Sequence, residues 1–527
     1  MTALTICLAG LQLTWTVELA YGSPYLISLG LSKAVLSLVW LAGPLSGLIM
    51  QPIVGSMSDR CTSSLGRRRP FMIAGTISVV FCFFLIGWTR EIVQIFIKDP
   101  KESVIALAIA AFYLLDFAIN AIQASIRALI VDILPTEQQD DGNAWAGRMI
   151  GVGSVAGYLF GFVDLVKVFP WVGETQIKVF CAIAIVILVL TVAASCFVVT
   201  EVPLDPVELQ HSNGGSSSGG GSLNPLATLK SIWRAMRTMP AGIRSVCNTQ
   251  FFAWIGWFPF LFYATTWVSE LYQSSAEFQA LPVDSDRMGA ATRQGSRAFF
   301  IYSLTSLAAA VLLPLLISVT SKGFKIGSLR LRLTVTHCYT ISHLIFAVAM
   351  LSTFWVNSVA GASALIITCG ISWAIMMWAP FALIGELIAR QQQGAVSQPP
   401  PPKLQRKEEG PNSASPTPSP PLSPKGNDSP PVSPVKMEQG QGSSDGEPLE
   451  AGAILGIHNV YVVLPQFLIT FVASIVFALL EGPAPEHKET ADGEEAHSAD
   501  AIGWVLRIGG ASALVAAYFS TRIARHF

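Results

Sequence analysis

A long apolar stretch between residues 104 and 134 carries four polar side chains at helical spacing: Asp116, Asn120, Gln123 and Arg127. At 100° per residue these positions lie within about 60° of one another, so a helix here would carry a polar stripe on one face. Ionised groups in mid-membrane are costly, and they usually face a bundle interior or a water-filled route for a solute or ion. The stripe therefore predicts a transport path.

The two charges of this stripe need separate partners. Asp116 and Arg127 are three helical turns apart, about 16 Å along the axis, which is too far for a direct ion pair. One of them is therefore expected to meet another helix or a ligand. The alternative is structural, with the aspartate hydrogen-bonded inside a bundle and the arginine reaching the lipid head groups from a helix end.

The composition is that of a polytopic membrane protein. The 527 residues are 52% hydrophobic and only 13% charged, which argues against a soluble enzyme. A net charge of −1 gives no indication of nucleic-acid binding. The eight cysteines are scattered without a C-x-x-C pair, so no disulfide and no metal site is expected. No nucleophile-base pair or phosphate loop suggests an enzyme.

Twelve apolar segments of membrane-spanning length follow one another, six on each side of a central polar segment. They lie near 4–29, 34–57, 70–89, 104–134, 143–165, 177–199, 244–269, 296–319, 332–354, 359–388, 452–480 and 501–521. The predicted fold class is an all-α polytopic membrane protein, with twelve transmembrane helices in two six-helix halves.

Loop charge and composition divide the chain further. Loops on one side hold roughly twice as many lysines and arginines as the other, so both termini are predicted to be cytoplasmic. The predicted units are an N-terminal half (1–200), a cytoplasmic linker (201–243), helices seven to ten (244–390), a cytoplasmic Pro/Ser-rich loop (391–450), and the last two helices with the C-terminus (451–527). The 391–450 loop is expected to be disordered. Its Ser/Thr-Pro steps suggest kinase sites, with an inert spacer as the alternative.

The loop after the second span carries opposite charges at two helix ends. Asp59 and Arg60 close one predicted helix, and Arg67, Arg68 and Arg69 open the next. Carboxylate-guanidinium pairs here could latch the two helices and break when they move apart, which is a gating role. The pattern resembles the G-x-x-x-D-R-x-G-R-R loop of the major facilitator superfamily, with a longer insert. Alternatively, the basic loop only fixes topology.

A wider resemblance is to the sucrose:proton symporter branch of the glycoside-pentoside-hexuronide transporters, closest in look to fungal members. The matching segments are Leu11–Trp15, Ser23–Tyr25, Leu41–Ser63, Leu65–Phe71, Leu114–Leu129, Trp257–Trp267, Thr292–Gly295 and Leu455–Gln466. The resemblance implies the major facilitator fold and proton-coupled uptake of sucrose or related α-glucosides by alternating access. It also implies no cofactor beyond the coupling proton, and a place in the plasma membrane, with the vacuolar membrane as the alternative.

The resemblance implies roles for three charged residues. Asp116 matches the family's proton carrier, Arg127 matches an arginine of sugar recognition, and Arg293 matches the arginine of span 8. The physical chemistry agrees, because an intramembrane carboxylate can take up a proton on one side and release it on the other. A guanidinium offers five donors to sugar hydroxyls. Asn120 and Gln123 extend the predicted binding stripe.

Several positions depart from the plant members of that branch. Glu18 is a second intramembrane carboxylate where those proteins have glutamine, and it could bind sugar, share the proton or be structural. Ala264, Thr266 and Gly289 stand where they have aspartates, and Lys33 where they have histidine. These changes make maltose or another α-glucoside an alternative to sucrose.

Further residues are candidates for sugar contact. Trp15, Tyr25, Trp254 and Trp257 could stack on a pyranose ring, with ordinary packing as the alternative. Asn459 in span 11 could line the cavity or join helices by a hydrogen bond. The expected partners are a sugar, protons and the lipid bilayer. Two other functions stay open: transport of another solute, such as a monosaccharide, and a sugar sensor that signals through the 391–450 loop.

Overall fold

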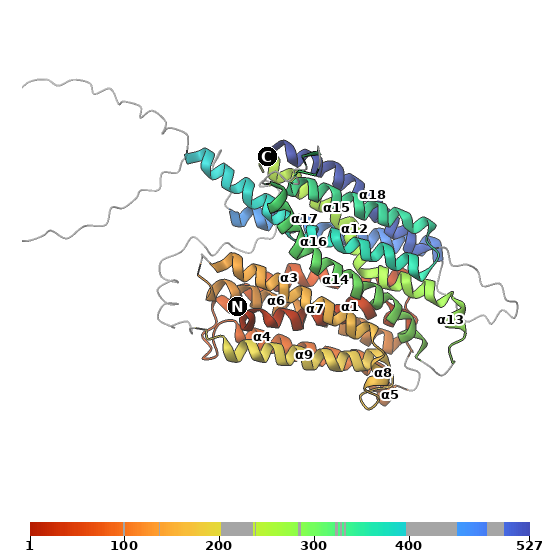
Figure 1. Cartoon of the computed structure of the whole chain (residues 1–527). Coiled ribbons are helices and arrows are strands. Elements are labelled where there is room, and N and C mark those ends of the chain that lie inside the picture. Colours follow the sequence, from red (N-terminus) through yellow and green to blue (C-terminus); the bar gives the residue numbers. More distant parts are fainter. Residues whose placement is uncertain are drawn as a thin grey trace, which may run out of the picture.

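The computed structural model describes residues 1–97, 101–135, 138–201, 236–237, 239–282, 286–321, 325–326, 329–330, 334–396, 451–481 and 500–526. Long helices dominate these residues and form two groups lying side by side (Figure 1). One antiparallel strand pair, β1 (Lys325–Ile326) and β2 (Leu329–Arg330), is the exception in the described part of the chain. The predicted all-α class is confirmed. Most of the predicted linker and of the 391–450 loop lies outside the described residues.

The N-terminal half contains six membrane-spanning units. They are α1 (Thr2–Ser28), α2 (Lys33–Val39) continued by α3 (Ala42–Asp59), α4 (Arg69–Gly87), α6 (Lys101–Ile133), α7 (Gln139–Phe162) and α9 (Gln176–Val198). The short helices α5 (Thr89–Phe96) and α8 (Leu165–Val168) lie in the connections. These units correspond one to one to the six predicted spans.

The C-terminal half contains the other six. They are α12 (Ala241–Gln273), α14 (Arg287–Ser321), α15 (Val335–Ser352), α16 (Val359–Val396), α17 (Ala451–Glu481) and α18 (Ala501–Ile523), with α13 (Ala276–Gln279) and the 3₁₀ turns η2 (Thr353–Trp355) and η3 (Ala524–His526). Helix α16 runs through residue 396, so residues 391–396 are helical rather than part of the predicted disordered loop. Helices can exceed the predicted spans because their polar ends extend beyond an apolar core of about 30 Å.

Eleven of the units are long and apolar enough to cross a membrane within the described residues, and α7 completes the set of twelve. Glycines lower the hydropathy of α7, yet they allow it to lie directly against α1. A Cβ atom at Gly153 would come 2.4 Å from the carbonyl oxygen of Ala9, and one at Gly157 would come 2.6 Å from Thr16. Side chains at these positions would force the two helices apart.

The second span is broken, whereas the sequence predicted one helix near 34–57. Helix α2 ends at Val39 and α3 begins at Ala42, which leaves Trp40 and Leu41 in the break. Pro44 explains it, because proline has no N–H to donate to the carbonyl of Trp40 and its ring crowds that carbonyl. The break leaves Trp40 between two helical segments rather than inside one helix.

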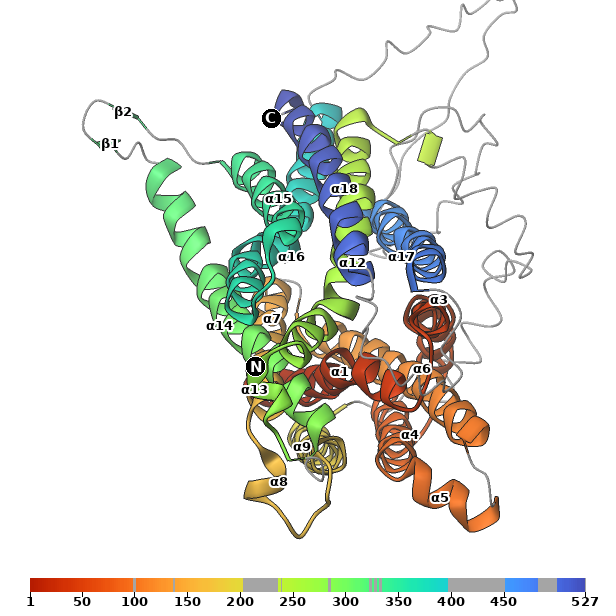
Figure 2. The same ribbon diagram turned by 90° about the vertical axis from the view of Figure 1, so that its right-hand side faces the viewer.

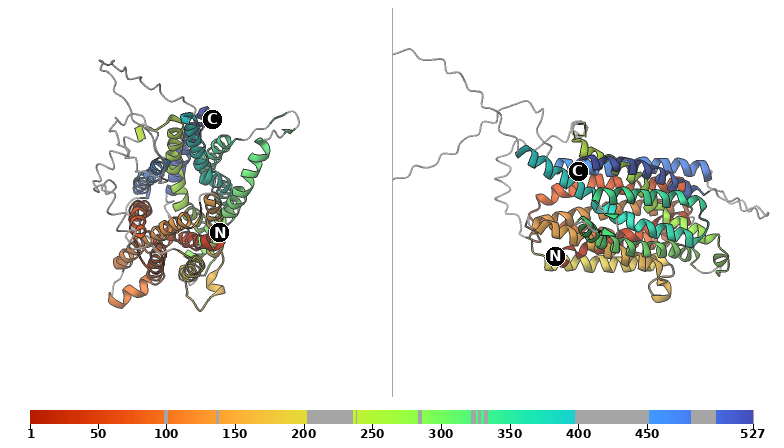
Figure 3. Two further views of the ribbon diagram at one scale, coloured as in Figure 1. Left: turned by 90° about the vertical axis from the view of Figure 1, so that its left-hand side faces the viewer. Right: turned by 45° about the horizontal axis from the view of Figure 1, so that its top comes forward.

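The two halves form separate groups when viewed along the helices (Figure 2), and their long helices run in roughly the same direction (Figure 3). Contacts between the halves include α7 against α14, α2 against α17, and α1 against α12. We call the end that carries α5, α8 and α13 the outer end, since loop charge predicts it to be extracellular. The opposite end is the inner end.

Candidate functional site

The polar stripe of α6 faces α3. Asp116 and Asn120 are buried, with 5% and 4% of their surface exposed. The Asn120 amide donates to Ser46 Oγ at 2.9 Å and to the Asp116 carbonyl at 3.0 Å. Glycines make room on α3, since a Cβ at Gly43 would lie 3.9 Å from Asp116 Oδ1 and one at Gly47 would lie 3.4 Å from Asn120 Oδ1. The small residues Gly43 and Gly47 thus allow α3 to pack against the outer part of the stripe.

Helix α1 brings a second carboxyl to the stripe. Glu18 is 5% exposed and interacts directly with Asp116. The two side chains line one cavity of about 10 Å³, which is the space of about one water molecule. The rest of its wall consists of Gly22, Leu26, Val39, Trp40 and Phe112. The structure therefore joins the two predicted proton-coupling residues in one buried pair.

The stripe becomes accessible toward the inner end. Gln123 is half-buried and Arg127 is exposed. Arg127 makes no hydrogen bond or ion pair within the described ranges of the chain. A cation on the polar face of a spanning helix normally has a counter-charge or faces water. Its accessible guanidinium is free to donate to a solute that enters from the inner end.

Trp15 lies on the side of α1 that faces the C-terminal half. The half-buried positions in the middle of α1 are Gln12, Trp15 and Leu19, which share one side of a helix. The Leu19 carbonyl accepts a hydrogen bond from Thr265 Oγ1 of α12 at 3.4 Å. The side shared with Leu19 therefore faces the boundary between the halves, as a sugar-stacking ring would need to.

A stacked row of aromatic rings follows α12 and ends on the N-terminal half. The ring centroids of Trp254 and Phe258 are 4.7 Å apart, those of Phe258 and Phe262 are 5.8 Å apart, and those of Phe262 and Trp40 are 4.4 Å apart. We call these four rings the aromatic row. Near its inner end, Trp254 Nε1 and the side-chain oxygen of Gln250 are buried without a hydrogen-bond partner among the described residues.

Two predicted sugar-stacking residues are engaged in packing within their own halves. The Tyr25 hydroxyl donates to the Ile86 carbonyl at 2.9 Å, beside Thr89. Trp257 is 1% exposed, and its ring lies 4.2 Å from that of Phe346. The structure does not bring these two rings to the stripe, and their role in sugar binding stays a prediction.

Arg293 and Asn459 also lie apart from the carboxyl pair. Arg293 of α14 forms an ion pair with Asp164 of the N-terminal half at 3.5 Å, at the outer end. Beside it, the backbone N–H of Gln176 donates to Asp286 Oδ2 at 2.9 Å, again across the halves. Asn459 is exposed on the inner part of α17. The structure thus places Arg293 at a closed contact between the halves, and its contact with sugar stays a prediction.

The outer end carries further contacts between the halves. Together with the Asp164–Arg293 and Gln176–Asp286 contacts, they are called the outer contacts below. Lys33 Nζ lies 2.6 Å from Glu270 Oε1. Ser474 Oγ of α17 donates to the Ala34 carbonyl at 2.9 Å. Sequence reasoning missed Glu270, although an acidic residue at the outer end of span 7 faces a lysine at the outer start of span 2.

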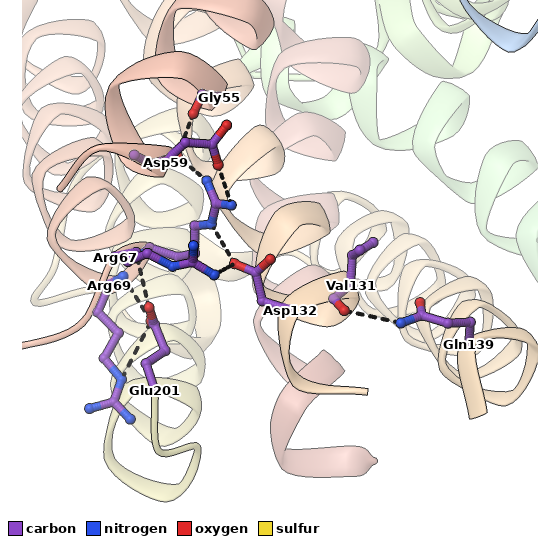
Figure 4. A network of polar contacts seen from close by, with 10 residues as sticks. Gly55, Asp59, Arg67, Arg69, Val131, Asp132, Gln139 and Glu201 are labelled. Atoms are coloured by element: carbon purple, nitrogen blue, oxygen red, sulfur yellow. Dashed lines mark hydrogen bonds and ion pairs between the residues drawn. The ribbon is translucent and has the colours of Figure 1, made fainter. Parts of the chain in front are cut away.

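The arginine loop forms a network at the inner end (Figure 4). The Arg68 guanidinium lies 2.5 Å from Asp59 Oδ1 and 2.8 Å from Asp132 Oδ2, and it also donates to Ser58 Oγ. Burial disfavours this charge, but hydrogen bonds and attraction from Asp132 and Asp59 outweigh burial and raise the pKa of Arg68. The predicted pairing of the two helix ends is present, because Asp59 ends α3 and Arg68 precedes α4.

Glu201 adds a cap to the same network, which we call the inner network. Its carboxylate accepts the backbone N–H groups of Arg68 at 2.8 Å and Arg69 at 3.1 Å, which satisfies donors at the N-terminus of α4. Arg67 pairs with Asp132 at 3.1 Å, whereas Arg60 is exposed. Sequence reasoning missed Asp132 and Glu201, although both are acidic residues at inner ends of spans. All these residues belong to the N-terminal half, including Glu201 beyond the predicted boundary at 200.

The family profile of the Major Facilitator Superfamily matches residues 3–398. The chain belongs to the major facilitator superfamily. It is a multi-pass membrane transporter and not an enzyme, as its similarity to permeases over nearly its whole length indicates.

Individual relatives agree with that family. The chain is 34% identical to a general alpha-glucoside permease of Schizosaccharomyces pombe over 98% of this chain and 92% of that protein. It is 30% identical to a sucrose transport protein of Oryza sativa subsp. indica over 73% of this chain and 79% of that protein. Among solved structures, a D-xylose-proton symporter superposes with a TM-score of 0.53 at 13% identity, covering 98% of this chain and 96% of that chain. The last similarity concerns the fold alone.

Proposed function

We propose that this protein is a proton-coupled sugar symporter that takes up sucrose or a related α-glucoside by alternating access. The observation that carries the proposal is the buried Glu18–Asp116 pair at the closed end of a polar stripe. The relatives named as an alpha-glucoside permease and a sucrose transport protein support the choice of solute. No cofactor beyond the coupling proton is part of the proposal.

The carboxyl pair is the proposed proton site. Two adjacent carboxylates repel each other strongly where water is scarce, so the pair is most stable when the two groups share one proton. Asp116 would take up this proton when the outer end is open, and Glu18 would share it. Release follows when the inner side of the stripe becomes wet, because a charged pair is then better solvated.

The sugar site is proposed to lie between the halves, inward of the carboxyl pair. Arg127, Gln123 and Asn120 offer polar groups on α6, and Trp15 offers a ring on α1. Across the boundary, the aromatic row of α12 offers flat apolar faces, and the unpartnered Gln250 oxygen could accept from a sugar hydroxyl. Trp257, Tyr25, Arg293 and Asn459 would join only after rearrangement.

Coupling follows from linkage between the two sites. Rocking of one half against the other exposes the shared site to one side at a time, as in other transporters built from repeated halves. If sugar binds more tightly to the protonated pair, protons must by the same factor bind more tightly to the sugar-loaded protein. A proton gradient can then drive sugar accumulation.

The function is tested by uptake into proteoliposomes that contain the full chain. Labelled sucrose and labelled maltose are supplied at acidic and at neutral external pH, with unlabelled glucose as competitor. Accumulation stimulated by external acid, with proton entry caused by the sugar and no competition by glucose, is the expected result. Uptake that ignores pH indicates a facilitator, and strong competition by glucose favours a monosaccharide carrier. A variant without residues 397–450 controls for the sensor function, because a carrier keeps its uptake.

We further propose that kinases act on the 391–450 loop, whose sequence holds repeated Ser/Thr-Pro steps such as Ser415, Ser419 and Ser423. These residues lie outside the described part of the chain, so the proposal rests on sequence alone. Mass spectrometry of the protein purified from its own cells should find phosphate at these serines. An unmodified loop under all growth conditions would leave it a spacer.

A further inference from the structure

Trp40 stands between the carboxyl pair and the outer end. Its side chain forms part of the wall of the cavity that Glu18 and Asp116 share, and it is 6% exposed. It occupies the break between α2 and α3 that Pro44 produces. The ring is therefore held at a bend of the backbone rather than within a regular helix, directly beside the proposed proton site.

Both halves hold Trp40 in place. Its ring stacks on Phe262 of α12, with centroids 4.4 Å apart and planes 9° apart. Its Nε1–H donates to Ser23 Oγ at 3.1 Å, and Ser23 Oγ in turn donates to the Phe262 carbonyl at 3.0 Å. One residue of the C-terminal half thus fixes the tryptophan by stacking and, through Ser23, by hydrogen bonds.

Opening the outer end would break the stack with Phe262, because the two rings belong to different halves. Phe262 lies on α12 between Thr265, which contacts α1, and the inner part of the aromatic row. When the halves separate at the outer end, Phe262 moves away with α12. Trp40 then loses its stacking face, and Ser23 loses the carbonyl that orients it.

Few other titratable groups face this place. Tyr113 of α6 interacts with Asp116, and its hydroxyl donates to the Leu38 carbonyl at 3.2 Å. Helices α2 and α3 present no titratable side chain between Lys33 and Asp59. On α12, Tyr263 is buried beside Phe262, with its ring against Phe477. The carboxyl pair is thus the main proton acceptor behind the tryptophan.

We propose that Trp40 is the plug that separates the Glu18–Asp116 pair from the outer solution, and that Phe262 of the opposite half is its seat. When the outer end closes, the Trp40 ring is held between the carboxyl pair and the outer solution. When the outer end opens, protons from the outer solution reach the pair. The plug makes proton access depend on the position of the other half. This inference rests on the proposed role of the pair as the proton site.

The test uses proteoliposomes that contain the full chain and an internal pH dye, with acid outside, the membrane potential clamped and no sugar present. The wild type should admit protons slowly. Trp40→Ala should admit them several-fold faster, because the stripe leads from the unplugged pair to the exposed Arg127. Phe262→Ala should leak as well, since it removes the seat from the other half. Trp40→Phe keeps a stacking ring but loses the Ser23 hydrogen bond, and its leak should be smaller.

Two controls assign the leak to this route. Trp88→Ala removes another stacked pair of the N-terminal half, with Phe84 at 5.2 Å, and should stay tight. Adding Asp116→Asn to Trp40→Ala should abolish the leak. Tight Trp40→Ala and Phe262→Ala vesicles would overturn the plug, as would a leak that survives loss of Asp116. If Trp40→Ala does not fold, Phe262→Ala decides the matter.

The same vesicles separate this inference from the proposed function. Proton entry caused by sugar in the wild type measures symport alone. If it occurs while Trp40→Ala and Phe262→Ala stay tight, symport stands and the plug is wrong. If sugar moves no protons while Trp40→Ala leaks through Asp116, the plug stands and symport is wrong.

Discussion

The outer contacts and the inner network use the same chemistry for different purposes. Lys33–Glu270 and Asp164–Arg293 each take one partner from each half, whereas Arg68, Asp59 and Asp132 all belong to the N-terminal half. Rocking motion must break the first kind and leaves the second kind inside one moving body. An ion pair can therefore act as a gate only if its two partners belong to different halves.

The central cation of the inner network is more deeply buried than the cations of the outer contacts. The side chains of Lys33 and Arg293 are 12% and 20% exposed, whereas that of Arg68 is 6% exposed. The carboxylates do not follow this order, since Glu270 and Asp164 are 36% and 26% exposed and Asp59 is 59% exposed. Partly exposed pairs contribute little and break easily, while removing one partner of a buried pair leaves a charge poorly compensated. The outer contacts are suited to repeated opening, and the inner network to holding helix ends together.

The largest effect is expected from Arg68→Ala. The change removes the Arg68–Asp59 ion pair, leaves Asp132 with Arg67 alone and removes several charge-assisted hydrogen bonds, so it should destabilise the N-terminal half by about 2–3 kcal/mol. Thermal unfolding of the purified protein in detergent measures the loss. Arg60→Ala in the same loop is the matched control and should unfold like the wild type. An unchanged Tm for Arg68→Ala would contradict a structural role of the inner network.

A charge reversal tests the outer contacts. Lys33→Glu places two negative charges together at the closed outer end, which should shift the protein toward outer-open states and slow uptake, without lowering the unfolding temperature as Arg68→Ala does. Adding Glu270→Lys to Lys33→Glu restores a pair of opposite charges and should restore most of the uptake rate. Transport at low and high salt, with thermal unfolding alongside, provides the measurement. A double variant as slow as the single one would show that the pair does not act across the halves.

Variants of Arg293 and Asp164 distinguish two possible roles of Arg293. As part of an outer contact, Arg293→Gln and Asp164→Asn should change the transport rate alike and leave the apparent sugar affinity unchanged. As a sugar ligand, Arg293→Gln alone should raise the KM, by about 1–3 kcal/mol in apparent binding free energy. Initial rates over a range of sugar concentrations distinguish the two patterns.

The smallest effect belongs to Gln250. Gln250→Leu removes a buried oxygen without a partner, so the folded protein should lose no more than about 1 kcal/mol and could gain stability. If that oxygen accepts a sugar hydroxyl, the KM for sugar rises while stability is kept. Asn248→Leu, two residues nearer the inner end and on another face of α12, serves as the control. Unchanged kinetics for Gln250→Leu would remove the residue from the sugar site.

The features that could be predicted from the sequence are those that recur at regular spacing along a single helix. The stripe from Asp116 to Arg127 follows from helical periodicity, and the twelve spans follow from hydropathy. The pairing of Glu18 with Asp116, and of Arg293 with Asp164, depends on how separate helices pack, which no local pattern encodes. The break at Trp40 does have a local cause in Pro44, but apolar residues on both sides concealed it.

The central claim is that Asp116 carries the coupling proton, and Asp116→Asn tests it most directly. In proteoliposomes loaded with unlabelled sugar, the variant should still exchange labelled sucrose or maltose across the membrane, because exchange needs no net proton movement. It should no longer accumulate sugar under an inward proton gradient, and sugar should no longer cause proton entry. A variant that still concentrates sugar with accompanying protons would contradict the claim and assign the coupling proton to another group.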